Sequence, residues 1–356
     1  MPSEAEHRRL VALRLSALGI SAPSAESPAG AVRHLLALQA QDYAGALWSI
    51  GLRTPGATLA SVEAAHHDGL LVRSWPFRST LHLVETHDLT WMLALTADRE
   101  HQKSAGRHRQ LELDAADFER AAAIARERLH GGGRLERTQL LAAFDEEGLS
   151  TAGQRGAHLL VRLAQSGVAV LCGQNTWTLL DDHVPHVRYL ERDAALDEIA
   201  RRFFTARGPA TDRDLAWWTG LTLTDVRTAI SRVADEFDRL EVDGVTHLLR
   251  PGLTEAEPGI HLLPGFDEYL LGYADRSAQL GGHPLTDVVP GGNGMFLATI
   301  VVDGVIAGTW RRTVTSKGVE ITLDPWRTFA GATRRGIEEA ATRYAAYLGV
   351  PLLALN

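Results

Sequence analysis

The sequence predicts a mainly α-helical fold with added β-structure, in the α+β class. Two segments, 133–180 and 208–249, each contain the pattern of a helix, a turn, a second helix and a hairpin. After residue 252 the pattern changes, because strand-forming segments replace most of the helical ones. We therefore expect a repeated unit followed by a different, β-rich C-terminal part.

The front of the chain is a candidate for a further copy of this unit. Helices are predicted over residues 5–18, 28–38 and 58–68, and strands are predicted within residues 70–84. This order again places helices before a hairpin. It extends the predicted repeat toward the N-terminus.

Residues 133–180 give the first clear unit. Thr138 can cap a helix that Gly148 ends. Apolar residues at three-to-four spacing mark the two helices: Leu140, Leu141, Phe144, Leu159, Leu160 and Leu163. Two strands are then expected at 168–173 and 176–180, joined by a turn.

Residues 208–249 repeat this order. Thr211 is expected to start a helix and Gly220 to end it, and the next helix carries Val226, Ile230 and Val233 on its apolar face. Asp-Gly at 243–244 is a strong hairpin signal. A helix-turn-helix followed by a two-stranded wing is a winged-helix unit. Such units serve DNA binding in some proteins and packing or protein contacts in others, so repetition alone leaves both roles open.

These patterns predict four consecutive domains. Three tandem winged-helix domains are expected at 1–105, 106–185 and 186–252, and a β-rich domain at 253–356. In the last domain, Asp-Gly at 303–304 predicts a hairpin turn, and a helix is expected over about 331–347. A small β-barrel or curled sheet, closed by that helix, fits this part.

Composition limits the function. The net charge of −8 argues against a protein coated for non-specific nucleic-acid binding, although residues 1–178 are close to neutral, with 18 basic and 19 acidic side chains. Cys172 is the single cysteine, so no intrachain disulfide or cysteine zinc site is expected, and we expect neither metal nor cofactor. No signal peptide or membrane span is predicted. We expect a cytoplasmic monomer.

The stretch LQAQD, residues 38–42, contains Gln39 and Gln41 where a helix is expected to end. The two amides either cap that helix end or hold a small polar group such as a water. Positions two apart on a regular helix point roughly 200° apart, so a shared target requires non-helical backbone. Asp42 could add negative charge beside such a site, or it could cap a helix starting at Tyr43.

Further polar residues are candidates for binding or catalysis. Arg73, Arg78 and His82 could contact phosphate or line a binding pocket, or the two arginines could form structural salt bridges while His82 is buried. Arg311 and Arg312 follow a predicted hairpin and could grip DNA, while the hairpin tip could probe a groove. The paired carboxylates of Asp267 and Glu268 suggest acid–base work or a buried structural network within an apolar strand.

Several motifs together resemble the winged-helix DNA glycosylases of the AlkZ and YcaQ type. The motifs are LQAQD, RSTLHLV, LLPGFDEYLLGYADRS, GGNGMF and VVDGVIAGTWRR, and they span nearly the whole chain. The resemblance implies a monofunctional glycosylase that removes bulky or crosslinking alkyl adducts at the seven-position nitrogen of guanine. The family signature of glutamine, an aliphatic residue, then glutamine or aspartate falls on Gln39, Ala40 and Gln41. The double-glutamine form resembles the AlkZ branch, often found beside pathways for DNA-alkylating natural products.

The resemblance also implies a chemical role for the glutamines. A guanine alkylated at that nitrogen is cationic and leaves its sugar readily, so two neutral amides that orient a water suffice. The implied partner is double-stranded DNA containing alkylated guanine, in the bacterial cytoplasm and on the nucleoid, for DNA repair or for self-resistance. The alternative from a different class is a non-catalytic winged-helix transcriptional regulator, which would typically bind two half-sites as a dimer.

Overall fold

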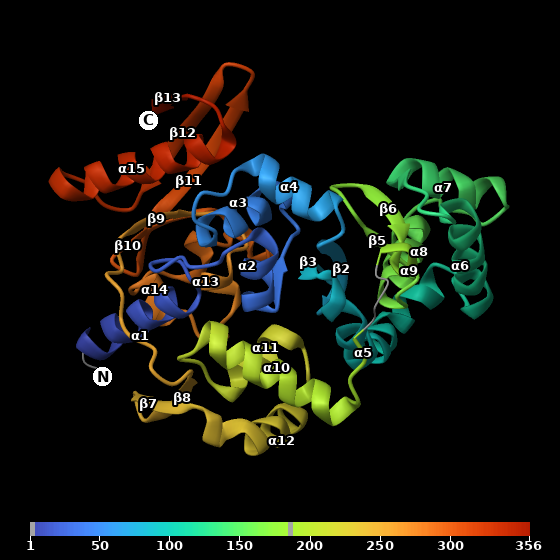
Figure 1. Ribbon diagram of the computed structural model, residues 1–356, viewed down its shortest axis with the longest axis horizontal. Helices are drawn as coiled ribbons and strands as arrows, with labels where there is room; N and C mark the ends of the chain where they lie inside the picture. Colours follow the sequence, from blue (N-terminus) through green and yellow to red (C-terminus); the bar gives the residue numbers. More distant parts are fainter. Residues whose placement is uncertain (1–3, 184–187) are drawn as a thin grey trace. The chain divides into compact units, whose positions relative to one another are not determined.

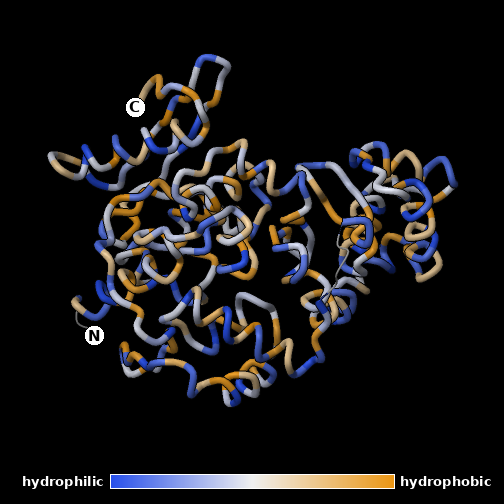
Figure 2. Tube along the Cα trace, viewed as in Figure 1, coloured by the Kyte–Doolittle hydropathy of each residue, from blue (hydrophilic) through white to orange (hydrophobic). Residues whose placement is uncertain are grey.

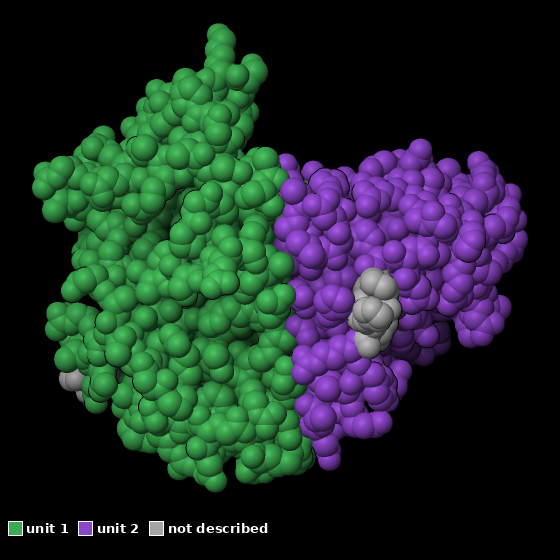
Figure 3. All heavy atoms as spheres, in the orientation of Figure 1, with its two compact units in different colours: residues 1–62, 197–356 green, residues 63–196 purple. Residues whose placement is uncertain are grey.

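A computed structural model describes residues 4–183 and 188–356, and it has a mixed α/β fold (Figure 1). The chain divides into two compact units: unit 1 is 1–62 with 197–356, and unit 2 is 63–196 (Figure 3). The chain passes between them within α4 (Leu59–His67) and α10 (Arg192–Arg207). The two units are groups of residues in mutual contact, so the boundaries of the four expected domains stay a prediction.

The helices of unit 1 come from both ends of the chain. They are α1 (Glu4–Ala17), α2 (Pro28–Leu35), α3 (Tyr43–Arg53), α11 (Asp212–Thr219), α12 (Leu223–Val233), α13 (Glu268–Leu271), α14 (Ser277–Leu280) and α15 (Gly331–Leu348), with short 3₁₀ helices η2 (Ala234–Glu236), η3 (Leu285–Asp287) and η4 (Pro290–Gly292). The predicted helices at 5–18 and 331–347 are confirmed. The helix predicted over 28–38 ends earlier, at Leu35, and α13 replaces the strand predicted around Asp267 and Glu268.

The C-terminal sheet of unit 1 has the strand order β13–β12–β11–β10–β9. Its strands are β9 (Ile260–Leu263), β10 (Thr299–Val302), β11 (Val305–Thr315), β12 (Gly318–Pro325) and β13 (Leu352–Leu355). The sheet is open, with β9 and β13 at its edges, so the barrel-like closure is not seen in the part of the chain that the structure describes. Helix α15 packs against β9, β12 and β13.

The helix pair and hairpin predicted at 208–249 are confirmed. Thr211 caps α11 through a capping box with Asp214, and Gly220 ends it in the left-handed conformation at φ 73°. Strands β7 (Asp238–Val242) and β8 (Val245–Leu249) are joined by Asp243 and Gly244, with φ of 56° and 71°. Two consecutive positive φ angles are what the predicted Asp-Gly turn requires.

Unit 2 combines a helical cluster with a sheet of strand order β3–β2–β5–β6–β4. Its helices are η1 (Thr86–Asp88), α5 (Leu89–Gln110), α6 (Ala115–Leu129), α7 (Arg137–Glu146), α8 (Arg155–Gln165) and α9 (Leu180–His183), and its strands are β2 (Leu71–Phe77), β3 (Thr80–Glu85), β4 (Leu135–Glu136), β5 (Ala169–Leu171) and β6 (Thr176–Leu179). The predicted order at 133–180 is confirmed, with one correction. The cap of α7 is Glu136 with Gln139, and Thr138 already lies inside the helix.

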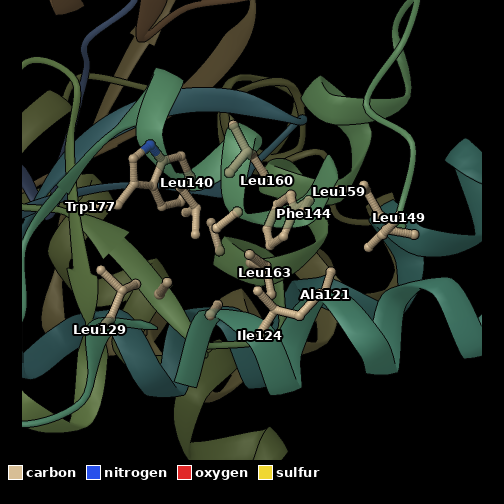
Figure 4. Packing of buried hydrophobic residues seen from close by; sticks show 14 of the residues in the cluster. Ala121, Ile124, Leu129, Leu140, Phe144, Leu149, Leu159, Leu160, Leu163 and Trp177 are labelled. Atoms are coloured by element: carbon tan, nitrogen blue, oxygen red, sulfur yellow. The ribbon is translucent and has the colours of Figure 1, made fainter. Parts of the chain in front are cut away.

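Apolar side chains of α6, α7, α8 and β6 form the core of unit 2 (Figure 4). The residues predicted from three-to-four spacing lie in it: Leu140, Phe144, Leu159, Leu160 and Leu163 are buried, and Leu141 packs against them. Trp177 of β6 joins the same cluster, so the hairpin is anchored to the helices.

Hydrophobic and hydrophilic residues alternate along the chain in both units (Figure 2). In α8 and α12 the apolar residues recur at three-to-four spacing, so each of these two helices has one apolar face for the core and one polar face. Among the described residues, no helix combines the length and the apolar character needed to cross a membrane.

Candidate active site

The segment that holds LQAQD begins with an abrupt helix end. Ser27 caps the start of α2, and the helix stops where Leu36 takes φ 67° and ψ −51°. Leu36 is fully buried, and a sparsely populated backbone conformation of this kind costs a residue with a Cβ roughly 1–3 kcal/mol. The chain then enters the short strand β1 (Ala37–Gln39). The tertiary structure must therefore hold this turn in place.

The two glutamine side chains meet just after this turn. Gln39 Nε2 donates to Gln41 Oε1 at 2.6 Å. The backbone at Gln39 is extended, so the wide angular separation that a helix would impose does not apply. Gln39 is buried, with 6% of its surface exposed, whereas Gln41 is exposed. An inner amide thus orients an outer amide that is open to solvent.

A buried ion pair fastens the backbone around the turn. Arg207, the last residue of α10, donates from its two terminal nitrogens to the carbonyls of Leu35 and Ala37, at 2.8 and 3.0 Å. Glu268 accepts the Gln39 N–H at 3.1 Å through Oε1 and binds Arg207 Nη2 at 2.7 Å through Oε2. Both charged side chains have 0% exposure.

Asp42 follows the glutamines and starts α3. Its Oδ1 accepts the Gly45 N–H at 3.1 Å, and its Oδ2 lies 3.5 Å from Arg312 Nη2 of β11. A side chain at position 45 would place a Cβ 2.5 Å from Asp42 Oδ2, so the cap requires glycine there. The alternative that Asp42 caps a helix starting at Tyr43 is confirmed. Its catalytic support stays a prediction.

Asp267 and Glu268 are both buried in structural networks, which was one of their two interpretations, but the two carboxylates have different partners. Arg53 binds both carboxylate oxygens of Asp267 at 3.0 Å, and Ser49 Oγ donates to it at 2.6 Å. Burial alone would raise the pKa of Asp267, but the Arg53 guanidinium and the hydrogen bonds outweigh it and lower that pKa. A carboxylate held in the ionised form by an arginine is poorly suited to exchange protons.

Two further candidate residues, Arg311 and Arg312, lie on β11. Arg312 of β11 is partly buried beside Asp42, whereas Arg311 is exposed. The predicted turn at 303–304 is confirmed, and its tip packs against the protein: Tyr269 Oη donates to the Gly304 carbonyl, and a Cβ at Gly304 would lie 2.5 Å from Val11 Cγ2. Asp303 remains exposed.

Arg73, Arg78 and His82 lie on the β2–β3 hairpin of unit 2. Arg73 is buried and donates to the Gln174 carbonyl at 2.7 Å, and His82 is fully buried with Nδ1 2.9 Å from the Thr80 carbonyl. Arg78 is partly buried at the turn, with φ 53°. The burial of Arg73 and His82 favours their structural interpretation, and DNA contact by the three residues stays a prediction.

Residues that sequence reasoning missed complete the site. Neither Arg207 nor Trp218, whose Nε1 donates to Glu268 Oε2 at 2.8 Å, was singled out as part of it. An arginine inside the otherwise apolar stretch FFTARGPA was the available signal. No group of three or more His, Cys, Asp or Glu side chains that could hold a metal ion occurs within residues 4–183 and 188–356.

Comparison with known proteins defines the class as a DNA glycosylase. The model of the family described as DNA glycosylase AlkZ-like matches residues 32–347, so the chain belongs to this family. The resemblance inferred from the motifs is thereby confirmed, and the glycosylase is favoured over the transcriptional regulator.

Two comparisons identify similar individual proteins. An interstrand DNA cross-link repair glycosylase from Streptomyces sahachiroi is 24% identical over 380 residues, covering 99% of both chains. The solved structure of the Streptomyces sahachiroi DNA glycosylase AlkZ aligns with a TM-score of 0.80 at 22% identity, over 98% of both chains. At this identity the second comparison establishes a shared fold.

Proposed function

We propose that this glycosylase hydrolyses the N-glycosidic bond of bulky or crosslinking alkylguanine adducts in double-stranded DNA. The contact between Gln39 Nε2 and Gln41 Oε1 carries the proposal, because it sets two neutral amides at one point next to solvent. The relative named as an interstrand DNA cross-link repair glycosylase supports this class of substrate.

The proposed reaction needs little acid catalysis. Alkylation at the seven-position nitrogen gives guanine a positive charge. When the bond to the sugar breaks, its electron pair moves to the base and neutralises that charge. The oxygen of a water forms the new bond to the anomeric carbon, and the proton it loses passes to solvent. The protein must position that water and tolerate an oxocarbenium-like sugar.

The two glutamines take different parts in this mechanism. Gln41 Oε1 already accepts a hydrogen bond from Gln39, and its second lone pair can accept a hydrogen of the attacking water. Gln39 is the buried member and fixes the direction of the Gln41 amide. Asp42 adds negative charge near the sugar cation, moderated by Arg312 at 3.5 Å.

The proposal extends to DNA binding. The helix pairs with hairpins at 137–179 and 212–249 act as winged helices, with a third in the N-terminal part. Arg311, exposed on β11, contacts phosphate, and Arg73, Arg78 and His82 support the lesion-binding surface of unit 2. The enzyme acts as a monofunctional monomer without metal or cofactor, in DNA repair or in self-resistance to an alkylating natural product.

One experiment tests the proposal. Purified protein in excess is incubated with duplex DNA carrying a single 7-methylguanine, and free base is measured over time. Gln39→Ala and Gln41→Ala should each slow release by about 10-fold to 100-fold, with duplex binding retained. Gln102→Ala, an exposed glutamine on α5, is the matched control. If both site variants fold and release the base at the unmutated rate, the glutamines are only a structural junction.

A further inference from the structure

Three side chains that are distant in sequence converge on the turn before the glutamines. Arg207 comes from the end of α10, Trp218 from α11, and Glu268 from the start of α13. Arg207 lies over the Trp218 ring, with its guanidinium carbon 4.1 Å from the ring centre. Trp218 Nε1 donates to the same Glu268 oxygen that binds Arg207. The three therefore form one buried cluster.

The cluster binds the backbone on both sides of Leu36. Arg207 reaches the carbonyl before it, at Leu35, and the carbonyl after it, at Ala37. Glu268 then takes the N–H of Gln39. A residue with φ 67° is held between these contacts. The path of the chain from α2 into Gln39 thus depends on one ion pair.

The chemistry of these contacts requires both charged residues. The planar guanidinium has several fixed donors, so it can bind two carbonyls and a carboxylate at once, whereas lysine offers a single compact charge. Glu268 uses one oxygen for Gln39 and the other for Arg207 and Trp218. Because both side chains are fully buried, water cannot replace a lost partner without rearrangement.

We infer that the Arg207–Glu268 ion pair, with Trp218, is a positioning device that sets the direction of the Gln39 and Gln41 amides in the reaction. The inference rests on the proposed function of the two glutamines. Arg207 and Glu268 act through the backbone of residues 35–39. A displacement of about 1 Å at a reacting group can cost about 100-fold in rate, so a backbone contact can control catalysis without touching substrate.

The test compares two buried arginine–carboxylate pairs of the same unit. Arg207→Lys alters the pair that holds the glutamine segment. Arg53→Lys alters the second pair. In that pair Arg53 donates to the carbonyls of Leu18 and Ser49, and Asp267 accepts from Ser49 Oγ and from the Tyr269 N–H. Single-turnover release of 7-methylguanine, duplex Kd and thermal unfolding are measured for both, at a temperature where both are folded. We expect Arg207→Lys to slow release at least about tenfold at unchanged Kd, and Arg53→Lys to leave the rate unchanged.

Two further variants keep the test decisive if Arg207→Lys does not fold. Trp218→Phe keeps an aromatic ring but removes the donor to Glu268, and Glu268→Gln removes the charge but keeps an acceptor for Gln39. Each should slow release without weakening duplex binding. Combined with Gln39→Ala, Glu268→Gln should slow release no further, because its effect reaches the Gln41 amide through the Gln39 side chain, which is gone.

The outcomes distinguish the proposed role of the two glutamines from the positioning role of the Arg207–Glu268 ion pair. Unmutated rates in folded Gln39 and Gln41 alanine variants overturn the proposed catalytic role of the glutamines, and the positioning role falls with it. Slow alanine variants combined with unmutated rates in folded Arg207→Lys or Glu268→Gln overturn the positioning role alone. An equal slowing by Arg53→Lys, or a full additional slowing by Glu268→Gln on top of Gln39→Ala, also overturns it, because a general packing defect would explain the loss.

Discussion

Replacing Gln41 by aspartate separates the effect of charge from the effect of amide geometry. Aspartate is one methylene shorter, which moves the acceptor by about 1.5 Å. The 2.6 Å contact from Gln39 Nε2 would therefore open beyond hydrogen-bonding distance unless the backbone shifts. Losing one neutral hydrogen bond costs about 1 kcal/mol, which corresponds to roughly fivefold in rate.

The new charge acts in the opposite direction. A carboxylate about 5 Å from the sugar cation, at an effective dielectric constant of about 20, attracts it by roughly 3 kcal/mol at most. The neighbouring Asp42 carboxylate opposes ionisation of the new group, and Arg312 partly offsets Asp42. We expect the two effects to leave the rate of Gln41→Asp within about tenfold of the unmutated rate at pH 7, and faster than Gln41→Ala.

The assay is single-turnover release of 7-methylguanine between pH 4 and pH 8. A new acidic limb should appear in the Gln41→Asp profile, because protonation of the introduced carboxyl, with an ordinary pKa near 4, removes the favourable charge. The limb should be absent from the unmutated enzyme and from Gln41→Ala. If Gln41→Asp is as slow as Gln41→Ala at pH 7 and its profile has no new limb, the electrostatic reasoning is wrong.

Three other outcomes are expected. Gly45→Ala should lower the melting temperature by about 2 °C or more, because the new Cβ would lie 2.5 Å from Asp42 Oδ2 and break the α3 cap. Gly106→Ala is the control and should not lower it, because a Cβ at position 106 would meet no atom closer than 4.0 Å. Burial lowers the pKa of His66 from 6.5 to about 4. The stability this histidine contributes is therefore present above pH 6.5 and is lost as the pH falls toward 4. The free energy of unfolding measured in urea should fall by about 2 kcal/mol from pH 7 to pH 5, and the fall should be smaller in His66→Gln. An excess of chelator should leave base release unchanged, and a loss that zinc or magnesium restores would contradict the metal-free mechanism.

Local chemistry explains which elements the sequence predicted well. Thr211 and Gly220 delimit α11 because a side-chain cap and a left-handed glycine act within one turn of the chain. The hairpin turn at Asp243 and Gly244 likewise depends on two adjacent residues. Such features need no information from distant parts of the sequence.

The helix end at Leu36 shows why other features were missed. Leucine gives no local signal for a left-handed turn, and Ala37 and Leu38 continue the apolar pattern of α2. The turn is held by Arg207 and Glu268, which lie more than 170 residues further along the chain. β13 was also missed, because its parallel pairing with β12 depends on the intervening helix α15.

The candidate site was only partly accessible from the sequence. The spacing of Gln39 and Gln41 on a presumed helix argued against a shared target, and the resemblance to a family was needed to select them. The extended backbone at Gln39 removes that objection. Glu268 was noticed as one of a carboxylate pair, but its contact with the Gln39 N–H is a tertiary interaction that no sequence pattern encodes.

Unit 1 is made of two separate segments of the chain, so its parts are synthesised at different times. Residues 1–62 emerge from the ribosome first, yet the side chains that fasten the glutamine segment arrive only with Arg207, Trp218 and Glu268. At about 5–20 residues per second, roughly 10–40 s of translation separate Val62 from Glu268. During that interval Leu35, Leu36 and Leu38, which are fully buried in the finished protein, lack their partners. A nascent chain stalled before residue 268 therefore carries both glutamines without the groups that align them.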